Sequence, residues 1–241
     1  MPFYPEKEKI NLHPAFILHH RPYRNTSLII DVLTREHGRI SLVAKGAKQA
    51  KSPWRGCLLP FQLLSLSWVK KTDLGTLTHA EITATSENLN GEAMYAAMYV
   101  NELLTRLVHK GDQTTEIFQH YVQTIEDLAA KSIAPVLRVF EFHLLQSLGF
   151  EIQLDVDEHQ HPIEAEIRYK YIPEHGFVIS NEKNVYLFEG KHILAFAQEK
   201  FDTQDVLQSA QRLMQAALKK RLGDEPLKSR ELFIAYKKMS S

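Results

Sequence analysis

The segment that decides the fold runs from Ser27 to Arg55 and reads SLIIDVLTREHGRISLVAKGAKQAKSPWR. Its first part contains two apolar-rich stretches of strand length, Ser27–Thr34 and Arg39–Ala44. His37-Gly38 between them is typical of a turn. Its second part carries four cations and no acid on a stretch punctuated by Gly, Ser and Pro. The segment therefore predicts two paired strands followed by a basic loop.

Three more strand-like stretches flank this segment: Ala15–His20, Leu63–Trp68 and Thr76–Ala84. Arg21-Pro22 has the composition of a turn, and Pro2–Lys9 that of a loose polar arm. Five short strands in about 70 residues favour a small closed barrel, because closure removes exposed strand edges. The pattern does not separate an SH3-like barrel from other five-stranded barrels.

From Asn90 the apolar period changes from two residues to about 3.6, which predicts helices. The expected helices run from Asn90 to near Gly111, from Thr115 to Ala129, from Pro135 to Gly149, from an N-cap at Asp202 to Gly223, and over Ser229–Lys238. Between them, residues 155–192 lose the helical period, although Ile167–Ile172 and Phe177–Ser180 fit a pair of short strands.

The expected fold class is α+β, with a five-stranded barrel, a helical bundle and a small irregular insertion. The predicted domains are residues 1–85 for the barrel, 86–154 plus 200–241 for the helices, and 155–199 for the insertion. The apolar stripes of the helices require that they pack on one another.

The formal net charge of zero conceals a segregation along the chain. Residues 1–85 hold 12 basic and 6 acidic side chains, residues 86–165 hold 4 and 13, and residues 166–241 hold 13 and 10. The 44% hydrophobic content excludes a disordered chain. The asymmetry points to a basic face for a polyanion and a separate acidic body.

The single cysteine, Cys57, excludes an intrachain disulfide and a thiolate zinc site, and it fits a reducing compartment. The first residues lack the apolar core of a signal peptide, and no apolar run reaches the length of a membrane span. We therefore expect no membrane association and a cytoplasmic location.

The basic loop is the strongest functional signal, since its cations are spaced to follow a phosphate backbone and Trp54 offers a face to a base. The alternative is a solvated loop with Trp54 packed into the barrel. The loop cations are Lys45, Lys48, Lys51 and Arg55, and the cations at nearby strand ends are Arg21, Arg24, Arg35 and Arg39. A second basic cluster is C-terminal and includes Lys228 and Arg230.

Arg138 lies alone among apolar neighbours on the third helix: Val136, Leu137, Val139 and Phe140. A lone cation beside a hydrophobic groove can clamp an acidic chain end. The residues themselves favour the simpler alternative, in which Arg138 pairs with Glu141 or Glu102.

The loop Asp155–His161 mixes carboxylates with two histidines, but adjacent ligands in one flexible loop seldom provide closed metal geometry. We therefore predict no metal and no cofactor. We also find no phosphate-binding Gly loop, nucleophile elbow or catalytic carboxylate pair, so no catalytic residue is predicted.

Five motifs in register resemble those of the bacterial recombination mediator family RecO. They are Ala15–His19 followed by Arg21–Tyr23 and Thr26–Leu28, the VAKGA stretch within Leu42–Lys48, YVNELL at Tyr99–Leu104, LRVFE at Leu137–Glu141 with Leu148–Phe150, and LKSRELF at Leu227–Phe233. The resemblance covers residues 12–236. It implies an OB-fold for the barrel. Some members bind zinc through four cysteines in the region of residues 155–180, where this chain has none.

The resemblance also implies a non-enzymatic DNA-repair function. It implies binding to single- and double-stranded DNA, annealing of complementary strands, association with RecR, and help in loading the RecA recombinase. By position it makes Arg39, Lys45 and Lys48 DNA contacts and makes Arg138 the clamp for the acidic C-terminal tail of the single-stranded-DNA-binding protein. The rival hypotheses are a metal-dependent nuclease using residues 155–161 and a structural adaptor without DNA affinity.

Overall fold

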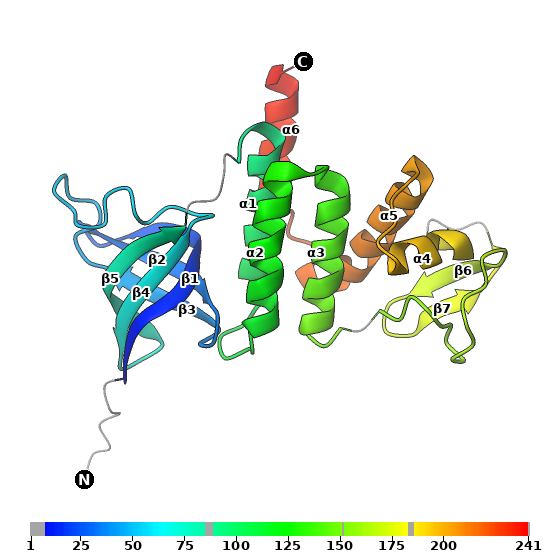
Figure 1. Cartoon of the computed structure of the whole chain (residues 1–241), viewed down its shortest axis with the longest axis horizontal. Helices are drawn as coiled ribbons and strands as arrows, with labels where there is room; N and C mark the ends of the chain where they lie inside the picture. The colour runs from blue at the N-terminus through cyan, green and yellow to red at the C-terminus, as the bar shows by residue number, and fades with distance from the viewer. Residues whose placement is uncertain (1–7, 85–88, 151, 183–185, 241) are drawn as a thin grey trace, which may run out of the picture. The chain divides into compact units, whose positions relative to one another are not determined.

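The computed structural model describes residues 8–84, 89–150, 152–182 and 186–240 (Figure 1). The chain divides into two compact units, Met1–Ala129 with Leu227–Ser241, and Ala130–Pro226. The fold class is α+β, as predicted. The division into three domains stays a prediction. Within the described ranges, no helix has both the length and the apolar character needed to cross a membrane.

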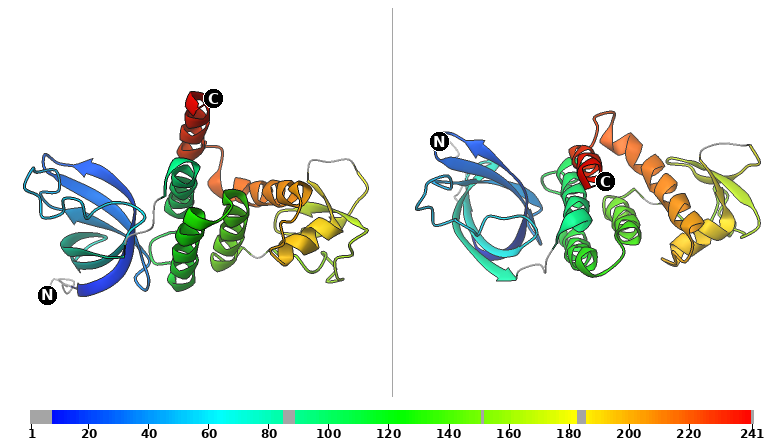
Figure 2. Two further views of the ribbon diagram at one scale, coloured as in Figure 1. Left: turned by 45° about the horizontal axis from the view of Figure 1, so that its top comes forward. Right: turned by 90° about the horizontal axis from the view of Figure 1, so that it is seen from above.

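Five strands of the first unit close into a barrel in the order β1-β2-β3-β5-β4. Figure 2 shows this barrel from two further directions. They are β1 (Glu8–Tyr23), β2 (Ser27–Thr34), β3 (Arg39–Ala44), β4 (Leu63–Lys70) and β5 (Leu74–Ala84). All pairs are antiparallel except β3 and β5. The inward side chains form the core around Trp68, which is 1% exposed. A Cβ at Gly75 would lie 2.7 Å from Leu42 Cδ2, so any larger residue there would require the buried Leu42 side chain to shift.

Strand β1 is longer than the sequence pattern predicts. Glu8 and Lys9, expected in a polar arm, pair with β4, while residues 2–7 of that arm lie outside the described residues. The turn expected at Arg21-Pro22 is wrong, since both residues pair with β2. This half of β1 pairs with β2 alone, and proline is tolerated in a strand that has a neighbour on one side only.

Helices α1 (Gly91–Leu107) and α2 (Thr115–Ala130) pack against the outer face of the barrel. Phe16 of β1 lies with its ring centroid 5.3 Å from that of Phe118 and 4.8 Å from that of Tyr121. Asn101, which is 5% exposed, donates from Nδ2 to the carbonyl oxygen of Leu18 at 3.0 Å. The outer face of β1 is therefore covered by helices and does not face solvent at these positions.

Helix α6 (Lys228–Ser240) returns to the first unit and packs on α1. The Glu102 carboxylate accepts from the N–H groups of Lys228 at 2.9 Å and Ser229 at 2.8 Å, and from the Ser229 hydroxyl at 2.6 Å. It thus caps the α6 N-terminus, where free N–H groups and the helix dipole favour an anion. The rings of Phe233 and Tyr236 pack against Tyr95 at tilted angles and complete the contact between α6 and α1.

The second unit begins with α3 (Ile133–Ser147), which ends as predicted at a glycine. Gly149 has φ +79° and its N–H donates to the Gln146 carbonyl, while the Phe150 N–H reaches the Leu145 carbonyl. These two bonds form a Schellman motif, which satisfies the last carbonyls of the helix.

The region 155–199 is more regular than the expected irregular insertion. It holds a three-stranded sheet, in the order β7-β6-β8, followed by helix α4. These elements are β6 (Arg168–Ile172), β7 (Gly176–Ile179), β8 (Leu187–Glu189) and α4 (Gly190–Ala197). The β6–β7 pair matches the predicted strands. The three residues of β8 and the eight of α4 are too short for a periodic pattern to reveal them.

Helix α5 (Gln204–Leu222) packs on α3 and α4. The expected N-cap at Asp202 is wrong by one residue, because the Thr203 hydroxyl accepts from the Val206 N–H at 3.3 Å. Gly223 ends the helix as predicted, with φ +69°.

Candidate functional site

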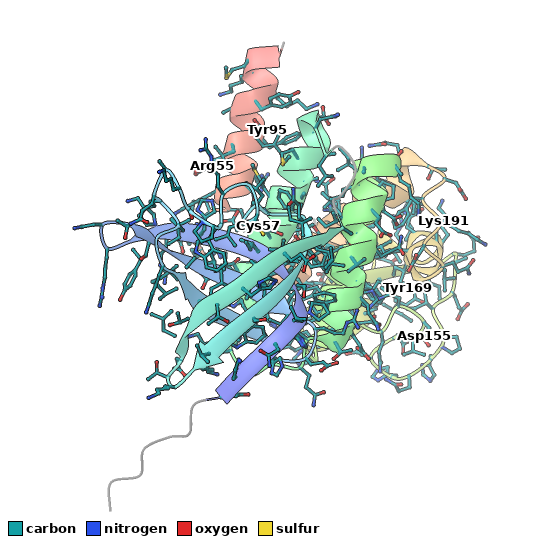
Figure 3. All side chains as sticks on the ribbon, turned by 60° about the vertical axis from the view of Figure 1, so that its left-hand side comes forward. Arg55, Cys57, Tyr95, Asp155, Tyr169 and Lys191 are labelled. Carbon is teal, nitrogen blue, oxygen red and sulfur yellow. The ribbon has the colours of Figure 1, made fainter. Side chains whose placement is uncertain are left out.

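The basic loop, residues 45–55, follows β3 and is folded as a series of turns. The Trp54 indole N–H donates to the Lys45 carbonyl oxygen at 2.9 Å, and the half-buried ring packs against the barrel core. Trp54 thus packs on the barrel, as in the alternative considered above. Its hydrogen bond to Lys45 also joins the two ends of the loop. The loop's four cations all lie exposed: Lys45, Lys48, Lys51 and Arg55. Figure 3 labels Arg55 at the end of this loop.

The thiol of Cys57, just beyond the loop, is half-buried against the same core. Burial raises the pKa of the Cys57 thiol, and the nearby Glu81 carboxylate raises it further. The group is therefore held as a neutral thiol and is not an activated nucleophile.

The turn between β1 and β2, residues 24–26, which we call the β1–β2 turn, lies next to the basic loop. The Lys48 N–H donates to the Thr26 carbonyl oxygen at 2.8 Å, which joins loop and turn. Arg24 in this turn is exposed and adopts the left-handed region at φ 51°, with its guanidinium 5.2 Å from the Tyr23 ring centroid. The structure therefore brings Arg24 together with the loop cations on one end of the barrel.

Arg21 lies on β1 near the same end and reaches solvent with 56% of its side chain exposed. Its guanidinium lies 3.6 Å from the buried carboxylate of Asp31, which also accepts from the Ser41 hydroxyl. Asp31 offsets part of the charge of Arg21, so Arg21 contributes less to the local potential than the loop cations.

Arg35 and Arg39 lie at the other end of β2 and β3 from the basic loop. β3 spans six residues, which at ~3.3 Å per residue separates Arg39 from Lys45 by roughly 20 Å. Arg35 is 5.5 Å from the Phe118 ring centroid, and its carbonyl accepts from the Thr115 hydroxyl. The structure thus does not bring these two arginines together with the basic loop.

Lys228 and Arg230 lie exposed in the first turn of α6, which packs on α1. The Lys228 backbone is held by the Glu102 carboxylate, and the side chain extends into solvent. Lys228 and Arg230 thus form a second basic site, which lies on a different element and far along the chain from the basic loop.

Arg138 lies in the middle of α3 and is 9% exposed. One of its terminal nitrogens lies 2.6 Å from Glu141 Oε1, one helical turn on, as the residue pattern favours. Its Nε is buried and has no partner among the described residues. Of its predicted companions, Leu137 is half-buried, whereas Val136 and Phe140 are 8% and 1% exposed and belong to the core.

The loop over residues 155–163 is closed by hydrogen bonds that engage its central carboxylate. Asp157 Oδ1 accepts from the N–H groups of His159 at 2.8 Å and His161 at 2.9 Å, and Val156 bridges to Pro162. The rings of His159 and His161 are more than two-thirds exposed. In the described parts of the chain, no three or more His, Cys, Asp or Glu residues gather in a way that could hold a metal ion.

Three further residues position these surfaces through partners 10 to 127 positions away in the chain: Asp31 beside Arg21, Glu102 beneath Lys228 and Asn101 behind the barrel. The sequence pattern assigns no role to the Asp31 and Asn101 side chains, and it offers Glu102 only as a possible partner of Arg138. The one signal for Asn101 and Glu102 is that both lie in the YVNELL motif.

Comparison with known proteins gives one consistent family. The sequence model described as "Recombination protein O N terminal" matches residues 11–86, and "Recombination protein O C terminal" matches residues 88–231. The chain is 42% identical over 226 residues to the DNA repair protein RecO of Actinobacillus pleuropneumoniae serotype 5b, covering 92% of this chain and 94% of that protein.

Two other relatives are similar to the same extent. The DNA repair protein RecO of Haemophilus influenzae strain 86-028NP is 43% identical over 224 residues, covering 92% of this chain and 95% of the relative. That of Coxiella burnetii strain CbuG_Q212 is 40% identical over 229 residues, covering 93% of this chain and 98% of the relative. The matches extend over both compact units of the chain.

Proposed function

This chain belongs to the RecO family of DNA repair proteins, which are recombination mediators and not enzymes, and on that premise we propose how its surfaces act on DNA and partners. We propose that the basic loop and the β1–β2 turn bind the phosphate backbone of single- and double-stranded DNA. The observation that carries this proposal is a set of four exposed cations on a loop anchored by Trp54. Contacts to phosphates leave the bases free, so two complementary strands can pair on the protein.

Replacing both Lys45 and Lys48 with alanine tests the DNA proposal. We expect weaker binding to oligonucleotides of any sequence, because phosphate contacts carry no sequence information. The slope of log affinity against log salt for a single strand should become shallower by about 1.4, which corresponds to two lost contacts. Fluorescence anisotropy with a labelled single strand measures both quantities.

The matched control replaces Lys110 and Lys200, two exposed lysines far from the loop in sequence, with alanine. This change removes the same charge and should leave affinity and slope close to those of the unaltered protein. Equal losses in both double variants would show that net charge matters and the loop does not. The absence of binding at low salt would favour the structural adaptor.

We also propose that Arg138 receives the acidic C-terminal tail of the single-stranded-DNA-binding protein. Its support is the family membership together with the buried guanidinium, whose Nε still lacks a partner among the described residues. A guanidinium matches a carboxylate in shape and charge, which suits a terminal carboxylate. Half-buried Leu137 offers an apolar contact beside it.

Arg138→Ala should abolish binding of an acidic, Phe-terminated peptide and leave DNA affinity unchanged, because the basic loop lies in the other compact unit. Isothermal titration calorimetry with the peptide and anisotropy with DNA separate the two activities. If folded Arg138→Ala binds the peptide within twofold of the affinity of the unaltered protein, Arg138 has only a structural role, as the partner of Glu141.

The remaining parts of the proposal concern partners. We propose that the chain associates with RecR and promotes loading of the RecA recombinase on single-stranded DNA, as family membership suggests. A DNA partner of this kind would place the protein in the bacterial cytoplasm, at the nucleoid.

A further inference from the structure

Arg138 and Glu141 form a deeply buried ion pair. Their side chains are 11% and 2% exposed, and the joining atoms are 2.6 Å apart. An isolated guanidinium at such a depth would be strongly unfavourable, so the paired carboxylate is what makes it compatible with folding. Glu141 is therefore the resident counter-ion of Arg138.

The same pairing sets the conditions for any second anion. The Arg138 Nε–H is buried without a partner in the described structure, so an oxygen placed there would satisfy it. A ligand carboxylate on this edge would share one guanidinium with Glu141. Two anions on one cation repel each other, and such a juxtaposition is costly away from water.

We propose that Glu141 is an internal competitor that limits how tightly Arg138 holds an acidic chain end. In the free protein its carboxylate neutralises Arg138. When a terminal carboxylate binds, the guanidinium is shared and Glu141 opposes the ligand. Glu141 is thus a specificity-determining residue for the tail site, and this inference rests on the tail-binding function proposed above.

Glu141→Gln tests the proposal, because glutamine keeps the shape and an oxygen acceptor while removing the charge. We expect affinity for an acidic peptide with a free terminal carboxylate to rise at least about tenfold, since the ligand becomes the sole counter-ion. The same peptide ending in an amide should show no such gain. A residue that merely supports the fold would change the binding of both peptides alike.

Glu126→Gln is the matched control, because it removes one exposed acid from α2. It should alter neither affinity nor the preference for the free carboxylate. Equal or weaker binding of the free-carboxylate peptide to folded Glu141→Gln would overturn the competitor role while leaving tail binding itself intact. Failure of the unaltered protein to bind the peptide would instead overturn the proposed tail function.

A measurement on the unaltered protein decides the matter if Glu141→Gln does not fold. The Nε–H resonance of Arg138 is identified in a ¹⁵N spectrum by its loss in Arg138→Lys. We expect it to shift when the free-carboxylate peptide is added and to stay in place with the amide peptide. No shift upon saturating binding would contradict a shared guanidinium.

Discussion

At the scale of single residues, Asn101 joins the helices to the barrel. Its side-chain amide donates to the Leu18 carbonyl at 3.0 Å, and its oxygen accepts from the Tyr121 hydroxyl at 2.7 Å. Tyr121 is fully buried, and burial raises the pKa of its hydroxyl well above the usual range, so it remains a donor. Three groups that would otherwise be buried without partners thus satisfy one another.

Asn101→Ala should lower the free energy of unfolding by about 3 kcal/mol, since it strands the Leu18 carbonyl and the Tyr121 hydroxyl. Tyr121→Phe removes only one bond and should cost about 1 kcal/mol. Denaturant unfolding measures both. A loss of less than about 0.5 kcal/mol for Asn101→Ala would mean that water replaces the amide.

Sequence reasoning could find Asn101 only as part of a motif. Its polarity interrupts the otherwise apolar buried face of α1, but nothing local indicates that one of its partners, Leu18, lies 83 residues earlier on a strand. The pairing of Arg138 with Glu141 was predictable, because three positions on a helix bring side chains together. Contacts at helical spacing can be read from a sequence, whereas long-range ones depend on the fold.

At the scale of elements, the hairpin-like loop over residues 155–163 is held by Asp157. The His161 N–H is the main group that holds the pKa of the Asp157 carboxyl below its usual range, followed by the His159 N–H. The loop is also tied to β7, since the Glu158 N–H donates to the Phe177 carbonyl oxygen. A carboxylate thus closes this loop through backbone N–H groups.

Asp157→Asn should lower the thermal unfolding temperature at pH 7 and lose that effect in acid. A carboxyl group whose pKa is lowered by folding stabilises the folded protein at any pH above its pKa in the unfolded chain, which is about 3.9. This stabilisation is lost as the pH falls through the lower pKa of the folded protein. The difference between the two proteins should therefore begin to shrink as pH falls below about 4 and should vanish only below the lowered pKa of Asp157. Asp155→Asn, an exposed neighbour, is the control, and a constant difference down to pH 3 would contradict the assignment.

Elements with a long, clear period were predictable, and those shaped by partners were not. The bounds of β2 and β3 agree with the pattern because both strands are buried and end at turns. β1 was underestimated because its polar ends pair with two different neighbours, and Pro22 lies in the half that pairs with β2 alone. The short α4 and β8 are held by the sheet around them and have no periodic signal.

At the scale of the whole molecule, charge is divided between parts with different proposed tasks. The net charge of zero averages a basic barrel segment, an acidic helical segment and a mildly basic C-terminal third. Four exposed cations gather on the basic loop, and Arg24 lies beside them, whereas Arg35 and Arg39 lie at the other end of their strands. The net charge of the barrel segment could be estimated from the sequence. Which of its cations lie close together could be known only from the way the strands pair in the barrel.

The salt dependence of DNA binding tests the central claim most directly. We would compare the unaltered protein with a variant in which Lys45, Lys48, Lys51 and Arg55 are alanine, by anisotropy with a labelled single strand over a range of salt. Affinity of the unaltered protein should fall steeply with salt, and the variant's slope should be shallower by about 2.8, the value for four lost phosphate contacts. A flat response of the unaltered protein, or the same slope in both, would contradict the account.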